Sequence, residues 1–211
     1  MARGRFITVE GIEGVGKSTN IDAIVARIQA AGLPVLTTRE PGGTPFAEDI
    51  REILVNRGEE PVPEMAELLL MFAARSFNVS NVIRPALDAG KWVVCDRFTD
   101  STRAYQGGGR GIPMETIDRI ATWVHGETWP DLTILLDAPV DVGMARAGRR
   151  SEPDRFEREQ HAFFERVRNS YLDIARNEPQ RVAVVDAARD VDTVTAETGA
   201  LVQRLLDNNS D

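Results

Sequence analysis

Residues 11–18 read GIEGVGKS, which fits the pattern G-x-x-x-x-G-K-[ST]. This stretch follows a short apolar run at 6–9 and precedes a segment in which Ile21, Ile24 and Ile28 recur at helical spacing. In a loop between a strand and a helix, glycines let consecutive backbone N–H groups point inward, and the helix N-terminus adds partial positive charge. The motif in this context predicts a phosphate-binding loop at the carboxyl end of the first strand. The alternative is a glycine-rich turn without a ligand.

Four further apolar runs, at 34–38, 92–95, 132–136 and 182–185, alternate with segments of helical periodicity. Runs of this kind, without polar alternation, are typical of strands covered on both faces of a parallel sheet. The order predicts an α/β fold of the P-loop NTPase class, a five-stranded parallel sheet with helices on both faces and ligands at the carboxyl ends of its strands. A length of 211 residues suits a single domain over 1–211.

Composition limits the partners of the chain. The formal net charge of −8 argues against broad nucleic-acid binding, which requires a basic surface to neutralise phosphates. Cys95 is the single cysteine, so an internal disulfide is impossible, and this usage is typical of a reducing compartment. No apolar run approaches the ~20 residues that cross a bilayer. We therefore expect a cytoplasmic protein whose partners are neither nucleic acids nor membranes.

Within the loop, Lys17 is expected to reach the outer phosphates of a bound triphosphate, and Ser18 offers its hydroxyl to Mg²⁺. Asp96 follows the apolar run 92–95, so its carboxylate emerges at the same edge of the sheet and is a second candidate for holding Mg²⁺. Capping, or pairing with Arg97, is the alternative for Asp96. The predicted nucleotide-binding residues are Gly11, Ile12, Glu13, Gly14, Val15, Gly16, Lys17, Ser18 and Thr19.

The chain contains no N-K-x-D segment for reading guanine and is short for an ATPase motor, which leaves a small kinase with its own acceptor pocket. Five segments occur in order: GIEGVGKST at 11–19, TREPGGT at 38–44, AAR at 73–75, DRFTDST at 96–102 and YQGGGRG at 105–111. Over about residues 6–186 they resemble the bacterial thymidylate kinases, a family of P-loop nucleoside monophosphate kinases. The resemblance implies phosphoryl transfer from ATP to dTMP with Mg²⁺, giving dTDP, and it suggests a homodimer.

The acceptor site begins within the P-loop. Glu13 is an unusual residue beside a triphosphate, because two negative groups repel each other. By the resemblance Glu13 contacts the 3′-hydroxyl of dTMP, and a solvent-facing carboxylate is the alternative. Arg39, Glu40 and Pro41 come at the end of the run 34–38 and are expected to shape the monophosphate site. The Glu40–Pro41 peptide bond is a candidate for the cis form.

Arg75 lies at the edge of an apolar stripe in the helix expected over 63–78, where packing does not explain an arginine. The resemblance implies that Arg75 donates to thymine O4 and that an aromatic ring stacks on the base. Family members often carry that ring four residues before the arginine, at Met71 here. We therefore expect Phe72 to take this role, with core packing as the alternative. By the resemblance, the sugar and base are lined by Ser101, Thr102, Tyr105 and Gln106, and Tyr105 disfavours a 2′-hydroxyl.

Phosphoryl transfer depends on positioning and on neutralising charge, so the arginines matter most. Arg97 suits bidentate contact with phosphate at the junction of donor and acceptor, with a salt bridge as the alternative. Eukaryotic-type members carry a P-loop arginine where this chain has Gly14. The segment at about 146–156 is rich in arginine and is predicted to form a short lid, or else a solvated charged loop. The predicted catalytic residues are Lys17, Arg97, Arg155 and, as the second lid arginine, Arg150. An arginine restored at Gly14 should then partly rescue the loss of Arg155, provided that its side chain fits without disturbing the backbone of the loop.

Two other functions fit parts of the sequence. A deoxynucleoside kinase shares the P-loop and the DR motif but needs a carboxylate base for a neutral 5′-hydroxyl, and Glu40 is placed where such a base would sit. A non-enzymatic P-loop switch would hydrolyse its nucleotide slowly without any acceptor. His125 and His161 lack the neighbours of a metal or nucleophilic site, so we expect both to be structural.

Overall fold

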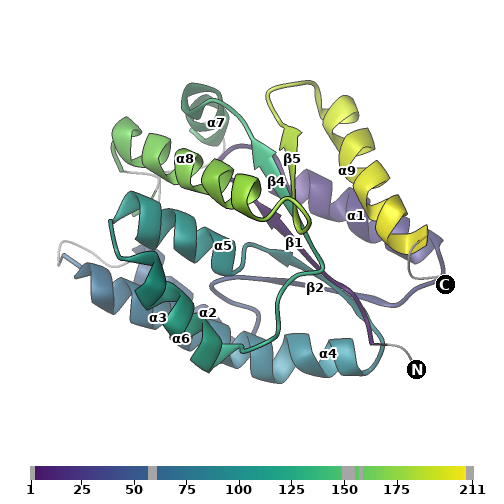
Figure 1. Ribbon diagram of the computed structural model, residues 1–211, viewed down its shortest axis with the longest axis horizontal. Coiled ribbons are helices and arrows are strands. Elements are labelled where there is room, and N and C mark those ends of the chain that lie inside the picture. Colours follow the sequence, from purple (N-terminus) through teal and green to yellow (C-terminus); the bar gives the residue numbers. More distant parts are fainter. Residues whose placement is uncertain (1–2, 57–60, 149–154, 157–158, 208–211) are drawn as a thin grey trace.

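The computed structural model describes residues 3–56, 61–148, 155–156 and 159–207. Its five strands form one parallel sheet in the order β2-β3-β1-β4-β5, with β1 in the centre (Figure 1). They are β1 (Phe6–Glu10), β2 (Val35–Arg39), β3 (Trp92–Asp96), β4 (Leu132–Asp137) and β5 (Val182–Asp186). The predicted five-stranded parallel sheet is confirmed. Strand β2 begins and ends one residue later than expected.

Helices connect the strands and cover the sheet. They are α1 (Lys17–Ala30), α2 (Pro45–Asn56), α3 (Glu64–Asn78), η1 (Val79–Ile83), α4 (Arg84–Asp88), α5 (Thr99–Thr102), η2 (Arg103–Gly109), α6 (Met114–Val124), α7 (Val140–Ala147), α8 (His161–Asn177) and α9 (Val191–Asp207). The segments η1 and η2 are π-helical, and η1 joins α3 to α4 without a break. The helix expected over 63–78 is confirmed as α3. No helix in the described ranges is both long and apolar enough to cross a membrane.

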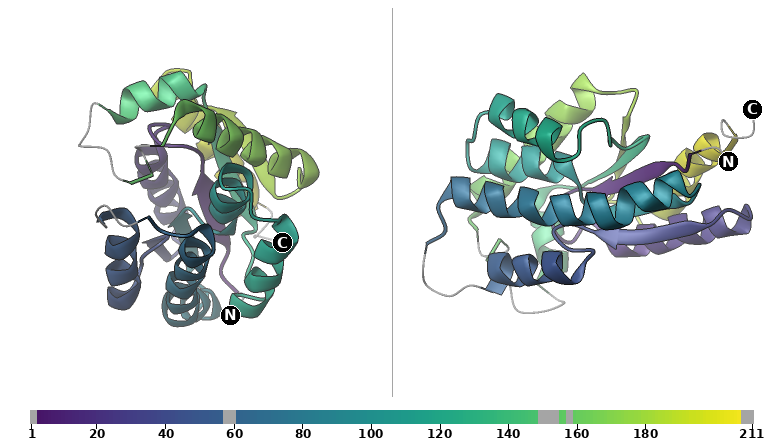
Figure 2. Two further views of the ribbon diagram at one scale, coloured as in Figure 1. Left: turned by 90° about the vertical axis from the view of Figure 1, so that its left-hand side faces the viewer. Right: turned by 90° about the horizontal axis from the view of Figure 1, so that it is seen from below.

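The two faces of the sheet bury different residues of the same strands. All five residues of β1 are buried, as expected for a strand covered on both sides. Ile7 and Val9 pack in one cluster with Ile24 and Ile28 of α1. Phe6 packs in another cluster that includes η1 and α4. Two views at right angles show helices on both sides of the sheet (Figure 2).

The register of the sheet brings three strand ends together. Val9 of β1 lies beside Asp96 of β3, and Arg39 of β2 lies on the other side of Asp96. The P-loop after β1 and the loops after β2 and β3 therefore start from adjacent positions. A cavity at this edge can draw side chains from all three loops.

Candidate active site

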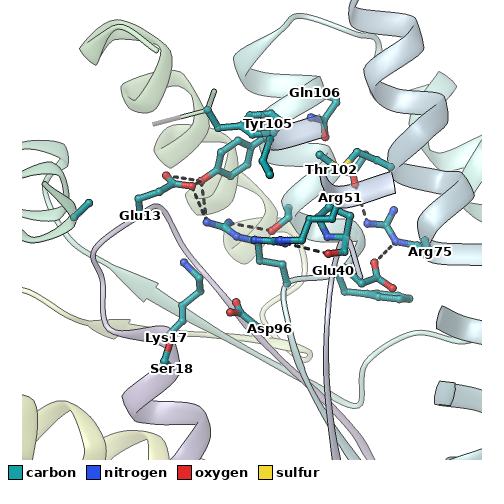
Figure 3. Close-up of a pocket in the computed structure, with 18 of the residues that line it drawn as sticks. Glu13, Lys17, Ser18, Glu40, Arg51, Arg75, Asp96, Thr102, Tyr105 and Gln106 are labelled. Atoms are coloured by element: carbon teal, nitrogen blue, oxygen red, sulfur yellow. Dashed lines mark hydrogen bonds and ion pairs between the residues drawn. The ribbon is translucent and has the colours of Figure 1, made fainter. Parts of the chain in front are cut away.

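A cavity of about 300 Å³ opens at this edge of the sheet, a size at the lower end of that of ligand pockets, ~300–1,000 Å³. Figure 3 shows Lys17, Ser18 and Asp96 at one end and Arg75, Glu40 and Thr102 at the other. The predicted residues that line it are Glu13, Gly14, Gly16, Lys17, Ser18, Glu40, Pro41, Arg75, Asp96, Arg97, Ser101, Thr102, Tyr105 and Gln106. The structure thus brings both predicted halves of the site, the phosphate loop and the acceptor pocket, into one continuous space.

The P-loop has the backbone that the motif requires. Gly11, Gly14 and Gly16 have φ values of 132°, 74° and 89°, in the region that favours glycine. The Lys17 ammonium donates to the carbonyls of Gly11 and Ile12, at 3.3 and 3.0 Å. Burial, and after it the nearby positive charge of Arg97, lowers the pKa of Lys17 to about 8. The end of the cavity that holds this amine is therefore suited to an anion.

Three predicted loop residues contribute no side chain to the cavity wall. Ile12 and Val15 are each 2% exposed and belong to the main hydrophobic core, so they can offer only their backbone. Thr19 lies in the first turn of α1 with an exposed side chain and does not line the cavity.

Gly14 packs against the backbone of α7. A Cβ atom at Gly14 would lie 1.9 Å from the carbonyl oxygen of Gly143, a distance that no side chain tolerates. The condition attached to the expected rescue of Arg155 by an arginine at Gly14, that the side chain fits without disturbing the backbone, is therefore not met. The arginine side chain could enter only if α7 moved, in addition to the strain of a positive φ.

Asp96 ends β3 within the cavity wall. Its Oδ1 atom is buried and has no hydrogen-bond partner among the described residues, which is unusual for a buried carboxylate oxygen. The Ser18 hydroxyl lines the same end of the cavity. Carboxylate and hydroxyl oxygens beside a phosphate loop are the hard donors that Mg²⁺ prefers, so these residues fit the metal.

Arg97 follows β3 and spans the cavity from the P-loop to its opposite wall. Its Nη1 donates to the carbonyl of Gly11 at 2.9 Å. Its Nη2 donates to Glu13 at 2.9 Å and to the Tyr105 hydroxyl at 3.2 Å. The Tyr105 hydroxyl also donates to Glu13 at 2.8 Å. The salt bridge predicted as the alternative role of Arg97 is thus present, and its partner is Glu13. Glu13 itself belongs to the cavity wall and does not face open solvent.

Arg75 of α3 is locked in a buried ion pair. Its Nε donates to Glu40 at 2.6 Å and its Nη2 donates to Thr102 at 2.9 Å, while its Nη1 is buried without a partner among the described residues. Asn78 donates to the other Glu40 oxygen at 3.1 Å. Burial raises the pKa of Glu40, and the Arg75 charge opposes that rise. Both oxygens of Glu40 are therefore occupied, which makes Glu40 a poor general base. The Glu40–Pro41 bond is cis.

Gln106 faces the cavity beside Arg75, and a buried carboxylate orients it. Its Nε2 donates to Glu67 of α3 at 2.8 Å, and the Glu67 side chain is 1% exposed. Because a carboxylate only accepts hydrogen bonds, the amide oxygen of Gln106 is left to face away from Glu67. Arg75 Nη1, a donor without a partner among the described residues, and the Gln106 amide oxygen, an acceptor, therefore belong to neighbouring residues of the cavity wall. Sequence reasoning did not identify Glu67.

Two predicted acceptor residues lie elsewhere. Phe72 is 2% exposed and packs with Leu68, Ile117 and Ala121, so the structure favours its core-packing alternative. Met71 lines the cavity instead. Arg39 is exposed, pairs with Glu48 at 2.7 Å and does not line the cavity.

The predicted lid arginine Arg155 is bound to the acceptor half of the molecule. It donates to Glu67 at 2.6 Å and to the carbonyl of Leu54 at 2.8 Å, and its guanidinium lies over the ring of Phe156. Phe156 itself lines the cavity. Arg150 lies outside the described residues, as does most of the expected lid.

Sequence reasoning also missed Arg51, which lines the cavity and donates to the carbonyl of Pro41 at 3.0 Å. Burial, and after it the charge of Arg39, lowers the pKa of Arg51. The available signal was its position in α2, one turn after Ala47 and within the buried stripe that continues to Leu54. An arginine in an apolar stripe was the same signal that identified Arg75.

Both histidines lie away from the cavity wall. His125 is buried, its Nε2 lies 2.9 Å from the Thr99 hydroxyl, and burial lowers its pKa to about 3. His161 lies 2.9 Å from Asp141 near the surface. These contacts agree with structural roles.

Comparisons with known proteins agree with this geometry. The family model described as thymidylate kinase matches residues 9–198. The chain is similar to the thymidylate kinases of Methylococcus capsulatus (55% identity, 98% of each chain covered) and Pseudomonas putida strain W619 (53% identity, 96% of this chain and 98% of the relative covered). Among solved structures it is similar to the thymidylate kinase of Ehrlichia chaffeensis, with a TM-score of 0.77 and 33% identity over 95% of this chain and 99% of that one. Because these matches span nearly the whole chain, the protein belongs to the thymidylate kinase family and transfers a phosphoryl group from ATP to dTMP.

Proposed function

We propose that dTMP occupies the half of the cavity bounded by Arg75 and Gln106, and that Mg²⁺ and the ATP phosphates occupy the half bounded by the P-loop. Three buried side-chain atoms have no partner among the described residues, and two of them belong to residues that line the cavity: Arg75 Nη1 at one end and Asp96 Oδ1 at the other. These two atoms are the observation that carries this assignment. One is a donor suited to a base carbonyl. The other is an acceptor suited to a metal or its water.

The base is recognised by a donor beside an acceptor. Arg75 Nη1 donates to thymine O4, and Gln106 Oε1 accepts from thymine N3–H. Cytosine presents the opposite pattern, an amino donor beside a bare ring nitrogen, so it leaves two buried groups unpaired. Met71 packs against the base in the place of the family's aromatic ring. Arg39 and Phe72 support the pocket from behind rather than touching the substrate.

The sugar lies between Glu13 and Tyr105. Their hydrogen bond at 2.8 Å fixes the Glu13 carboxylate at the cavity wall, where it accepts from the 3′-hydroxyl of dTMP. Tyr105 occupies the space that a 2′-hydroxyl would need. Ser101 and Thr102 complete this wall.

Lys17 and Arg97 neutralise the phosphates at the junction of the two substrates. Ser18 and Asp96 would hold Mg²⁺, which would supply charge compensation for the transferring phosphate. Arg51 faces the same junction. To contact a phosphate at this junction, Arg155 would have to give up its hydrogen bond to Glu67. Arg150 therefore stays the alternative catalytic arginine of the lid at 146–156.

Acceptor preference tests this assignment. The purified protein with Mg²⁺ and ATP should form ADP rapidly with dTMP, and slowly with thymidine, with dCMP or with no acceptor. Lys17→Ala should lose about 10²-fold or more in turnover, because the charge on the outer phosphates is removed. Preference for thymidine would favour the deoxynucleoside kinase. Hydrolysis independent of any acceptor would favour a nucleotide switch, and full turnover in Lys17→Ala would remove the P-loop assignment.

We also propose a cytoplasmic homodimer of one domain per chain over 1–211. The exposed apolar side chains of α2 and α3 support a dimer surface: Phe46 is 58%, Ile53 is 43% and Leu69 is 53% exposed. The Phe46 ring stacks on that of Phe77 at 4.5 Å, which extends this surface along both helices. Contiguous apolar surface of this kind marks an interaction site.

Light scattering tests the dimer surface. The wild type should have the mass of two chains, and Leu69→Glu should have the mass of one. Val191→Glu, which changes an equally exposed apolar residue on α9, should stay dimeric. A monomeric wild type, or a dimer unaffected by Leu69→Glu, would contradict the assignment.

A further inference from the structure

Glu10 is a buried carboxylate that sits outside the cavity wall. It is the last residue of β1, its exposure is 0%, and neighbouring strands lie on both sides of it. It accepts hydrogen bonds from the backbone N–H of Phe98 at 2.7 Å, the Ser101 hydroxyl at 2.5 Å and the Tyr171 hydroxyl at 2.9 Å. A charged group here is costly to bury, so its partners indicate what it does.

All three donors to Glu10 surround Arg97. Phe98 directly follows Arg97, which has φ of 68° and is the one described residue other than glycine with a positive φ. Holding a side-chain-bearing residue in this region costs about 1–3 kcal/mol and requires support from its surroundings. The bond from Phe98 N–H to Glu10 provides that support one residue after the strained position.

The two hydroxyls connect Glu10 to the Arg97 guanidinium. Arg97 Nη1 donates to both Ser101 and Tyr171, at 3.2 Å each. An ionised carboxylate can only accept, so a hydroxyl that donates to it keeps its lone pairs for the guanidinium. The Ser101 and Tyr171 hydroxyls also lie 2.7 Å from each other, so their two protons are shared among three short contacts of one network. A neutral side chain with an N–H₂ or O–H group at this position would reverse one of these bonds.

We propose that Glu10 is a positioning residue for phosphoryl transfer, which fixes the backbone of Arg97 through Phe98 and the guanidinium of Arg97 through Ser101 and Tyr171. Glu10 touches neither substrate. It keeps Arg97 aimed across the junction before the substrates arrive. This inference rests on the proposed role of Arg97 at that junction.

Glu10 changes its charge close to neutral pH. Burial, and after it the nearby Asp100, raises the pKa of Glu10 to about 7. Protonation turns one carboxylate oxygen into a donor, which weakens its hold on the two hydroxyls. The charged or titratable groups that face Glu10 are Arg97, Asp100 and Tyr171, with Lys17 and Cys95 further along the same edge. The phosphate of dTMP also titrates near pH 6, so only a comparison between variants isolates Glu10.

Steady-state kinetics of Glu10→Gln test the proposal. The isosteric amide should lower kcat by about 10- to 100-fold, because a misplaced catalytic group can cost that much, while KM for ATP changes little. The decrease in kcat at acidic pH that is caused by protonation of Glu10 should disappear in this variant. Thr8→Val is the matched control, since it removes a buried hydrogen bond to Thr133 from the same strand without touching Arg97. It should keep the wild-type kcat.

A double-mutant cycle separates positioning from general damage. If Glu10 acts through Arg97, then Glu10→Gln added to Arg97→Ala should cause almost no further loss of kcat. Additive losses would overturn the proposal, as would a normal kcat in Glu10→Gln beside a reduced kcat in Arg97→Ala. A normal kcat in Arg97→Ala would overturn the proposed role of Arg97 and this inference together. If Glu10→Gln does not fold, Tyr171→Phe takes its place, with the same expected non-additivity and the same contrary outcome.

Discussion

Arg75 has two partners whose needs differ, the acceptor base and the buried Glu40. Replacing Arg75 by Met removes the donor to thymine O4, which should weaken dTMP binding by about 1.5–3 kcal/mol while ATP binding is unchanged. It also leaves Glu40 buried without its cation, which should destabilise the fold by about 3–5 kcal/mol. Titration calorimetry with each nucleotide and urea unfolding measure the two effects separately.

The double variant Arg75→Met/Glu40→Gln provides the control for this experiment. Neutralising Glu40 should restore much of the stability, because no unpaired charge stays buried, but it cannot restore the donor to the base. A folded double variant that binds dTMP like the wild type would show that Arg75 serves only the ion pair. Equal weakening of ATP and dTMP would indicate a structural effect.

The sequence predicted that Arg75 lines the site, but it did not show which of its neighbours on the helix faces the cavity. Successive helical residues point about 100° apart, so Met71 and Phe72 cannot both face the cavity. Helix α3 is covered on one side by α2 and on another by α6, and apolar residues therefore occur on most of its surface. A stripe that wide does not reveal which residue borders the ligand. The sequence also left the ion-pair partner of Arg97 undecided, because that partner, Glu13, follows a different strand of the sheet.

Helix α3 illustrates how one element serves the whole acceptor pocket. Its Glu67 orients Gln106 and also accepts from Arg110 at 3.3 Å and Arg155 at 2.6 Å. In Glu67→Gln the new amide no longer forces one orientation on Gln106, so the acceptor for thymine N3–H is lost part of the time. We expect KM for dTMP to rise by the equivalent of about 0.5–1.5 kcal/mol and the preference over dCMP to narrow.

The measurement for α3 compares kcat/KM for dTMP and dCMP. Glu64→Gln, an exposed glutamate one turn earlier on the same helix, is the matched control and should leave both values unchanged. An unchanged preference in Glu67→Gln would mean that the orientation of Gln106 is set elsewhere.

The strands were the elements that the sequence predicted best, because their short apolar runs alternate with segments of helical periodicity. A longer apolar run at 68–74 belongs to α3, so continuity alone did not identify a strand. The P-loop was equally clear, since its backbone needs positive φ values, which glycine adopts readily. Arg51 and Glu67 were missed for a shared reason. Each lies within an otherwise apolar helical stripe, and its role depends on an element distant in sequence that periodicity cannot place.

Across the whole molecule, two buried groups give opposite pH dependences. His125, with a pKa of about 3 against an ordinary 6.5, contributes stability above pH 6.5 that is lost as the pH falls. Glu10, with a pKa of about 7 against an ordinary 4.5, contributes stability below pH 4.5 that is lost as the pH rises. Between pH 4.5 and 6.5 the two slopes, each about 1.4 kcal/mol per pH unit, should cancel.

Urea unfolding of three proteins at pH 4.5, 5.5 and 6.5 tests this cancellation. Relative to the wild type, His125→Gln should gain stability as the pH falls, because the contribution of Glu10 is no longer opposed by that of His125. Glu10→Gln should lose stability over the same range, because the contribution of His125 is no longer opposed by that of Glu10. Parallel curves for all three proteins would mean that neither group changes its proton affinity on folding.

The contact between Gly14 and the Gly143 carbonyl also limits how this enzyme can evolve. A single substitution cannot introduce a P-loop arginine here, since the first added carbon collides with the backbone of α7. A lineage that begins from this sequence must first displace α7, and only then does position 14 become free to vary. Positive charge can reach the phosphates from the P-loop itself or from the segment after α7. A change from one arrangement to the other first requires the displacement of α7, which by itself brings no benefit. This makes a gradual passage from one to the other improbable, and drift at position 14 stays confined to glycine while α7 keeps its place.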